Sequence, residues 1–220
     1  MYIDVSNVSI SFEENKEQHT ILNDVSLQVE KGEFICLLGP SGCGKSTLLN
    51  AMAGFLKPSS GEIKIDGQTV EKPSMKYVTI FQNYGLLPWR SVQKNVELGL
   101  ETKKLGKEEK KKITDHYLEM VGLKEAAKKR PAQLSGGMQQ RVAIARALAT
   151  KPSIILADEP TGNLDSKTSQ DVLGLLKVTG QKFKQTIVMI THNEEIAQMA
   201  DRIIRIEDGR ILAGGGQIHA

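Results

Sequence analysis

The chain has 220 residues, of which 40% are hydrophobic and 25% charged, and its formal net charge is +3. This composition is typical of a soluble globular protein, and the charge is too small to indicate a nucleic-acid partner. No apolar run reaches the roughly 18 residues of a membrane span, and the first residues lack a signal-peptide pattern. We therefore expect a cytoplasmic protein that does not bind nucleic acid.

Runs of apolar residues predict the strands in chain order. Strands are predicted at residues 3–12, 25–29, 34–38, 62–66, 75–81, 154–156 and 186–190, and a last hairpin at 203–206 and 210–212. Residues 92–129 are rich in Lys and Glu at helical spacing, and we expect them to form a helical subdomain with the helix after Gly137. Further helices are expected after the loop at 39–47 and near 166–176, and the glycines at 214–216 indicate a flexible tail. Strands that alternate with helices indicate an α/β fold with a parallel core.

A glycine-rich loop follows the apolar segment 34–38 and precedes a helix. Its sequence fits G-x-x-x-x-G-K-[ST], with the residues Gly39, Pro40, Ser41, Gly42, Cys43, Gly44, Lys45, Ser46 and Thr47. Such a loop directs backbone N–H groups and a helix N-terminus at phosphates. Lys45 is then expected to reach the β- and γ-phosphates, and the Ser46 hydroxyl to hold Mg²⁺. A disulfide between Cys36 and Cys43 would distort this loop, so we expect a reducing compartment.

Two carboxylates, Asp158 and Glu159, end the apolar segment that starts at Ile154. Parallel sheets bind ligands at the carboxyl ends of their strands, where Asp158 is placed to bind Mg²⁺. Successive side chains of a strand point to opposite faces, so the two acids are expected to have different roles. Glu159 is the better candidate to polarise the water that attacks the γ-phosphate.

Two more polar residues follow apolar strands, Gln82 and His192. The amide oxygen of Gln82 is able to ligate Mg²⁺ or hold a water molecule, and His192 is a candidate to contact the γ-phosphate and the attacking water. A lone Gln or His is more often a surface hydrogen-bonding residue. Their position at strand ends, where the other candidate residues fall, supports a role in the site.

A second glycine turn has the sequence LSGGMQQ, from Leu134 to Gln140. Its Ser135, Gly136 and Gly137 precede an apolar helical run, which places a hydroxyl and a helix N-terminus at one point. This arrangement suits an anion. The chain thus has two candidate phosphate-binding elements about ninety residues apart.

In this order, the motifs resemble those of the ATPase subunits of ABC transporters, over nearly the whole chain. The resemblance identifies the loop at 39–47 as Walker A, Gln82 as the Q-loop, LSGGMQQ as the signature, Asp158 and Glu159 as Walker B, the segment ending at Asp165 as the D-loop and His192 as the switch histidine. It implies a P-loop NTPase core with an antiparallel β subdomain, at about 1–82 and 152–220, and an inserted helical subdomain at about 83–151.

The resemblance also implies ATP as the nucleotide and a second ATPase chain as a partner. In this family two such domains form an ATP-dependent head-to-tail dimer, in which the signature of one faces the Walker A loop of the other. Phe12 lies where the family has the aromatic residue that stacks on adenine, and Asp165 is expected near the nucleotide. The dimer works on a permease in the membrane, which implies a peripheral location on its inner face.

The motifs of different branches are mixed in this chain. The segment from Phe81 to Arg90 resembles the nitrate, sulfonate and taurine importers, whereas the segments from Ala157 to Lys167 and from Ala200 to Ile204 resemble the macrolide-exporter and lipoprotein-release branch. The segment after Gln82 faces the membrane subunit in this family, so we favour an importer of a small anion-like solute. For Trp89, an interface role and simple core packing remain open.

Two other functions compete with an importer. One is the ATPase of an exporter, a lipoprotein-release complex or a cell-division-type mechanotransmission complex that need not transport a solute. The other is a soluble ABC protein acting on DNA or ribosomes, which the short distance between Gln82 and the signature disfavours. A small-molecule kinase should lack LSGGMQQ, and the guanine-binding Asn-Lys-x-Asp of GTPases is absent.

Overall fold

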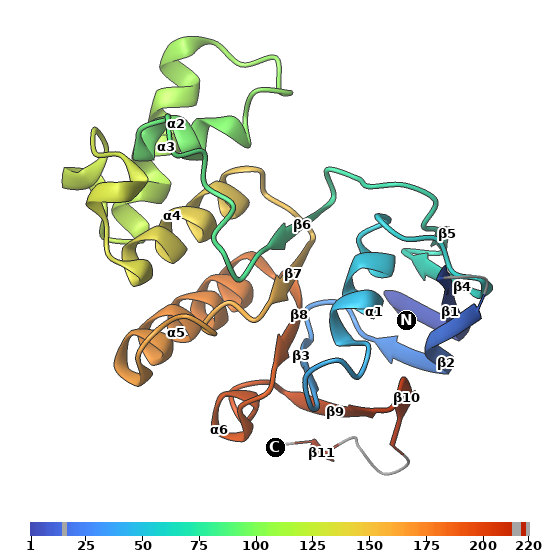
Figure 1. The fold of residues 1–220 in the computed structure, drawn as a ribbon. Helices are drawn as coiled ribbons and strands as arrows, with labels where there is room; N and C mark the ends of the chain where they lie inside the picture. Colours follow the sequence, from blue (N-terminus) through green and yellow to red (C-terminus); the bar gives the residue numbers. More distant parts are fainter. Residues whose placement is uncertain (15–16, 213–216, 219–220) are drawn as a thin grey trace.

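The computed structural model describes residues 1–14, 17–212 and 217–218, which form two sheets with helices around them (Figure 1). The antiparallel sheet has the order β2-β1-β4-β5, with β2 (Glu17–Val29), β1 (Ile3–Glu14), β4 (Ser60–Ile65) and β5 (Gln68–Thr69). The larger sheet has the order β10-β9-β3-β8-β7-β6, with β10 (Arg210–Ile211), β9 (Arg202–Glu207), β3 (Phe34–Leu38), β8 (Thr186–Thr191), β7 (Ile154–Asp158) and β6 (Tyr77–Ile80), and β11 (Gln217–Ile218) pairs with β9. The predicted flexible tail at 214–216 lies outside the described residues.

Residues 81–153, which connect β6 to β7 and are all described, form helices and turns without a strand. This agrees with the helical segment predicted at 92–129. The helices are α1 (Lys45–Met52), α2 (Val92–Leu98), α3 (Lys107–Met120), α4 (Gly136–Ala149), α5 (Ser166–Phe183) and α6 (Glu194–Ala197), with the 3₁₀ turns η1 (Lys124–Ala126) and η2 (Pro131–Gln133). In the described part of the chain, no helix is both long and apolar enough to cross a bilayer.

The central strand β3 explains how the larger sheet is stabilised. Cys36 belongs to a core shared with α4 and α5, whereas Ile35 and Leu37 belong to a second core shared with α1 and the antiparallel sheet. In Figure 1, α4 and α5 lie on one side of β3, and α1 and the antiparallel sheet lie on the other. Every residue of β3 is buried, as expected for a strand covered on both faces. Full burial of each aliphatic side chain contributes about 1.5–3 kcal/mol. The continuous apolar run at 34–38 is therefore required by the packing.

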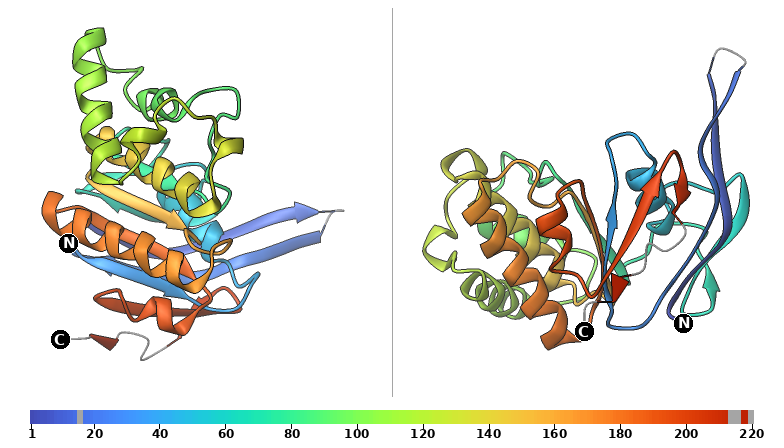
Figure 2. Two further views of the ribbon diagram at one scale, coloured as in Figure 1. Left: turned by 90° about the vertical axis from the view of Figure 1, so that its left-hand side faces the viewer. Right: turned by 90° about the horizontal axis from the view of Figure 1, so that it is seen from below.

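The strands β9, β3, β8, β7 and β6 are parallel neighbours, so their carboxyl ends share one edge of the sheet. The Walker A loop follows β3, Gln82 follows β6, Asp158 ends β7 and His192 follows β8. The expectation that these polar residues gather at one edge is met by the strand order. The antiparallel sheet contributes a long β1–β2 hairpin, which projects beyond the rest of the molecule (Figure 2).

The strand β2 begins at Glu17, eight residues before the predicted start at residue 25. The pairing of β1 with β2 changes register between Val8 and Ile10, and Asp24 has a left-handed backbone (φ 55°). These irregularities interrupt the alternation of apolar and polar residues that reveals a strand. The period of apolar residues therefore did not predict the first half of β2.

Candidate functional site

The Walker A loop curls around the side chain of its own lysine. The Lys45 ammonium donates hydrogen bonds to the carbonyl oxygens of Gly39 (2.8 Å) and Pro40 (2.6 Å). Gly42 and Gly44 have left-handed backbones (φ 82° and 103°), which glycine adopts without strain. The helix α1 then starts at Lys45, so its N-terminal N–H groups point into the loop. This geometry suits a phosphate group.

The other strands support this loop closely. A Cβ atom at Gly39 would lie 2.1 Å from the carbonyl oxygen of Ile206 in β9, and one at Gly44 would lie 2.6 Å from the Leu22 side chain. The Gly209 N–H of the β9–β10 turn donates to the Cys43 carbonyl at 3.2 Å. Cys36 and Cys43 are both free and buried, and burial raises the pKa of Cys36 to about 12. Its thiol is therefore unreactive at neutral pH.

The Ser46 hydroxyl donates to the Asp158 carboxylate at 3.0 Å, so the structure brings these two predicted Mg²⁺ ligands together. Burial is the main cause that raises the pKa of Asp158, and the negative charge of Glu159 acts in the same direction, against the Ser46 hydrogen bond and Lys45. A cation at this point would offset the cost of the buried charge. A hydroxyl with a single carboxylate also suits Mg²⁺, which keeps water and phosphate ligands.

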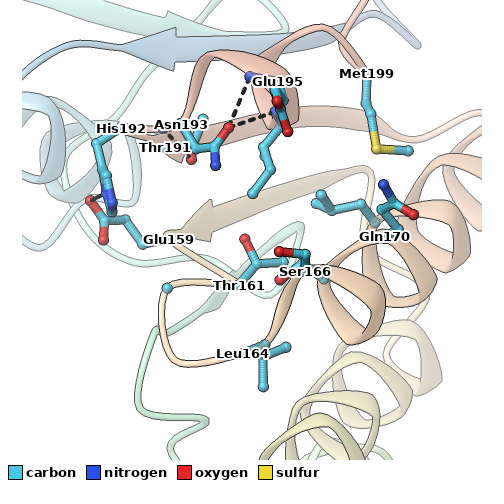
Figure 3. Close-up of a pocket in the computed structure, with 14 residues that line it drawn as sticks. Glu159, Thr161, Leu164, Ser166, Gln170, Thr191, His192, Asn193, Glu195 and Met199 are labelled. Carbon is cyan, nitrogen blue, oxygen red and sulfur yellow. Dashed lines mark hydrogen bonds and ion pairs between the residues drawn. The ribbon is translucent and has the colours of Figure 1, made fainter.

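Glu159 contacts His192, with the Glu159 carboxylate 3.2 Å from the His192 Nδ1 atom (Figure 3). The prediction that strand alternation separates Asp158 from Glu159 was wrong in its reason, because β7 ends at Asp158 and Glu159 has a left-handed backbone (φ 43°). This unfavourable conformation for a residue with a Cβ atom, rather than strand geometry, sets the direction of the Glu159 side chain.

Gln82 lies two residues beyond β6, next to the turn that follows Glu159. The Asn163 amide donates to the Gln82 carbonyl at 3.2 Å. A Cβ atom at Gly162 would lie 2.6 Å from the Gln82 Nε2 atom and 3.2 Å from a Glu159 carboxylate oxygen. Gln82 and Glu159 therefore meet at Gly162, and His192 joins them through its contact with Glu159.

A pocket of about 270 Å³ opens next to Glu159 and His192. Figure 3 shows these two side chains at one end of the pocket, with Gln170 of α5 and Met199 toward the other end. The pocket extends from these two residues toward α5 and α6, and none of its lining residues belongs to the Walker A loop.

The signature turn, which we define as Ser135, Gly136 and Gly137, lies at the start of α4. The Ser135 hydroxyl caps this helix by accepting a hydrogen bond from the Met138 N–H at 3.3 Å. Asp165 caps α5 in the same way, and its carboxylate accepts from the Thr168 N–H (3.0 Å) and hydroxyl (2.6 Å). Among the described residues, the signature turn and Asp165 share no hydrogen bond with the Walker A loop of the same chain.

Phe12 lies on β1 opposite His19 of β2, and 44% of its surface is exposed. An exposed aromatic ring on the projecting hairpin is free to stack on a planar base. Tyr84 and Arg146 belong to no motif in the sequence. Arg146 donates to the Tyr84 and Gly85 carbonyls in the segment after Gln82, and the Tyr84 hydroxyl lies against Gly136 of the signature turn. Arg146 was detectable only as a charged residue inside the apolar helix after Gly137.

A family profile described as ABC transporter matches residues 22–162. The nitrate import ATP-binding protein of Synechococcus elongatus is 44% identical over 205 residues, which cover 92% of this chain and 75% of the relative. The bicarbonate transport ATP-binding protein of the same species is 43% identical over 211 residues, covering 94% of this chain and 76% of the relative. A solved dimeric ATP-binding cassette in a post-hydrolysis state with ADP and Pi has 37% sequence identity and a TM-score of 0.88, with 98% of both chains covered.

These similarities and the motif geometry define an ATP-binding cassette with the P-loop NTPase fold. The chain belongs to the ABC transporter family, as the order of its motifs indicated. It is an ATP-binding subunit and an ATPase of this family, and its nucleotide is ATP.

Proposed function

We propose that this chain powers the import of a small anion-like solute, as one of two identical ATPase chains bound to an integral-membrane permease. Two relatives with more than 40% identity are named for nitrate import and bicarbonate transport, and both solutes are small oxygen-containing anions. The segment from Phe81 to Arg90 supports the same branch. The ATPase then lies on the inner face of the cell membrane, in the cytoplasm.

In the proposed site, the Walker A loop and α1 bind the phosphates of ATP, and Phe12 stacks on the adenine. Lys45 donates to the carbonyls of Gly39 and Pro40 and, at 3.7 Å, to the Cys43 Sγ atom. Sulfur is a weak acceptor, so the proton donated to it is the one that Lys45 would offer the β- and γ-phosphates. Ser46 and Asp158, with Gln82, hold Mg²⁺, which would neutralise charge on the phosphates. The Ser46–Asp158 hydrogen bond supports the first two ligands of this set.

Glu159 acts as the general base in this proposal. A base must lie within hydrogen-bond reach of the water that it activates, and Glu159 lies directly after Asp158 at the sheet edge, with its carboxylate 3.2 Å from the His192 Nδ1 atom. His192 then orients Glu159 and contacts the γ-phosphate, and Gln82 orients the same water. In this proposal Glu159 takes the proton of the attacking water, and His192 and Gln82 hold the γ-phosphate and that water by hydrogen bonds.

The signature turn completes the site of a second chain. The single observation that carries this proposal is the separation of two phosphate-binding elements: the signature turn has an exposed serine, yet it has no described hydrogen bond to its own Walker A loop. A head-to-tail dimer places each signature turn, with Asp165 nearby, against the nucleotide of the partner. The solved dimer with ADP and Pi is similar over nearly the whole chain.

The two phosphate-binding elements belong to different parts of the chain in this proposal, the Walker A loop to the catalytic core and the signature turn to the helical subdomain. Residues of about 1–82 and 152–220 form the catalytic core with its β subdomain, and about 83–151 form the helical subdomain that carries motion to the permease. Trp89 in this subdomain is 68% exposed, which disfavours the core-packing interpretation and supports an interface anchor.

Mixing two inactive variants tests the head-to-tail site. Lys45→Ala removes the phosphate contact of one chain, and Ser135→Arg blocks the signature turn of the other. Each homodimer should be inactive, and mixing the two should restore turnover through one intact composite site per heterodimer, measured as phosphate release. No recovery at any mixing ratio, with both variants folded, would contradict the arrangement.

The main competing function is an exporter, lipoprotein-release or mechanotransmission ATPase, which the Ala157–Lys167 segment resembles. Purifying the chain with its membrane partner and identifying that partner by mass spectrometry separates the two functions. A permease with a periplasmic solute-binding partner supports import, and a permease that carries a large periplasmic domain of its own contradicts it.

A further inference from the structure

Tyr84 lies in a strained turn between two parts of the site. It follows Gln82 by two residues and has a left-handed backbone (φ 64°), and Gly85 after it is also left-handed (φ 55°). The Tyr84 N–H donates to the Phe81 carbonyl at 3.0 Å, which closes the turn around Gln82. A non-glycine residue in this conformation is uncommon and costs roughly 1 kcal/mol, so the surroundings must hold it there.

Arg146 of α4 is hydrogen-bonded to the backbone of this turn. Its guanidinium donates to the Tyr84 carbonyl at 2.9 Å and to the Gly85 carbonyl at 2.5 Å. Burial lowers the pKa of Arg146, because its charged guanidinium has lost water contacts. The hydrogen bonds to these two carbonyls replace part of that hydration. The backbone just after Gln82 is therefore fixed to α4.

The Tyr84 side chain reaches the other end of the same helix. A Cβ atom on Gly136 would lie 2.8 Å from the Tyr84 hydroxyl oxygen and 3.7 Å from the Cζ atom of its ring. The same Cβ atom would lie 3.2 Å from the Leu164 side chain, which precedes Asp165. The end of the tyrosine ring thus packs directly against the backbone of the signature turn.

We propose that Tyr84 is a positioning residue that sets the signature turn of its own chain in register with the segment around Gln82. Its importance rests on the head-to-tail arrangement proposed above, in which Gln82 serves the nucleotide of its own chain and the signature turn serves that of the partner. A single side chain then joins two nucleotide sites through a path within one chain. The Asn163–Gln82 hydrogen bond closes this junction on the side of α5.

The mixed dimer of Lys45→Ala and Ser135→Arg chains separates the two contacts of Tyr84. In its one working site, the Lys45→Ala chain supplies the signature turn with Asp165, and the Ser135→Arg chain supplies the Walker A loop and Gln82. Tyr84→Ala is placed in one chain or the other, and the maximal rate of phosphate release from ATP is measured at saturating partner. We expect at least a fivefold loss when Tyr84→Ala is in the Lys45→Ala chain, although the Gln82 of that chain is not in the working site.

An unchanged rate in that arm, with a loss only when the Ser135→Arg chain carries Tyr84→Ala, would overturn the inference and leave the head-to-tail site intact. An inactive parent mixture would instead refute the head-to-tail site and the role of Tyr84 with it. The two failures are therefore distinguishable.

A milder variant covers the case in which Tyr84→Ala fails to fold. Tyr84→Phe keeps the packed ring and removes only the oxygen nearest Gly136, and we expect at least a twofold loss in the same arm with ATP binding and Tm retained. The matched control is Tyr77→Phe, whose hydroxyl donates to the Lys72 carbonyl at 3.3 Å, away from the junction. Equal rates for the two phenylalanine variants would count against the inference.

Discussion

The catalytic edge and the signature turn are built in different ways. At the edge of the parallel sheet, side chains that lie at or just after the carboxyl ends of different strands contact one another, as in the pairs Ser46–Asp158 and Glu159–His192. The backbone of the signature turn instead packs directly against Tyr84 and the start of α5, because Gly136 and Gly137 have no side chain that would keep these groups apart. Substitutions at the edge should therefore change chemistry, whereas substitutions at the signature turn should first change packing.

The largest expected effect tests the chemical side of this comparison. Glu159→Gln should lower ATP turnover by roughly 10²–10⁴-fold while ATP still binds, because the amide cannot accept a proton. The variant should also accumulate an ATP-dependent dimer, measured by size-exclusion chromatography. A Glu159→Gln chain that hydrolyses ATP at the wild-type rate would exclude Glu159 as the base.

Gly137→Ala tests the packing side. The new Cβ atom would lie 2.2 Å from the Thr168 methyl group, so overpacking should destabilise the fold by about 1–3 kcal/mol and lower Tm by roughly 2–12 °C. Thr168→Ser deletes this methyl group and keeps the hydroxyl that donates to Asp165. The double variant should recover most of the lost Tm, and Thr168→Ser alone is the control. No recovery would show that the contact does not set the cost.

Asp158→Asn tests whether the buried charge of Asp158, which is proposed to bind Mg²⁺, destabilises the nucleotide-free fold. Burial raises the pKa of Asp158 above its ordinary value of 3.8, so the fold favours the neutral acid. Stability from this group is present at low pH and is lost as pH rises through the raised pKa. Nucleotide-free Asp158→Asn should therefore gain about 1–3 °C in Tm over the wild type at pH 7, and less near pH 4. A gain that is equal at both pH values would contradict this cause.

Trp89→Ala should have the smallest effect on the isolated chain, because its side chain is largely exposed. Surface substitutions usually change stability by at most about 0.5 kcal/mol, so Tm and basal ATP hydrolysis should stay close to wild type. Stimulation of hydrolysis by the permease should fall, with Trp89→Phe as the conservative control. An equal loss of basal and stimulated rates would favour a structural role.

The sequence predicted the catalytic edge better than the surroundings of the signature turn. Strands buried on both faces, such as β3 and β8, require continuous apolar runs, and the parallel order then places their polar ends together. The left-handed backbone of Glu159 left no such pattern. The hydrogen bonds of Arg146 to Tyr84 and Gly85 were hidden too, because they join residues about sixty positions apart through backbone carbonyls, which every residue has.

The position of β3 in its sheet has a consequence for the order in which the site matures during synthesis. Its neighbours are β8 and β9, which the ribosome makes about 150 residues later, and Gly209 supports the Walker A loop from further along the chain. A nascent chain therefore carries the phosphate loop long before the loop has its strand partners. Competence to bind ATP should arise late in translation, so a partly made chain would not engage nucleotide before its fold is nearly complete.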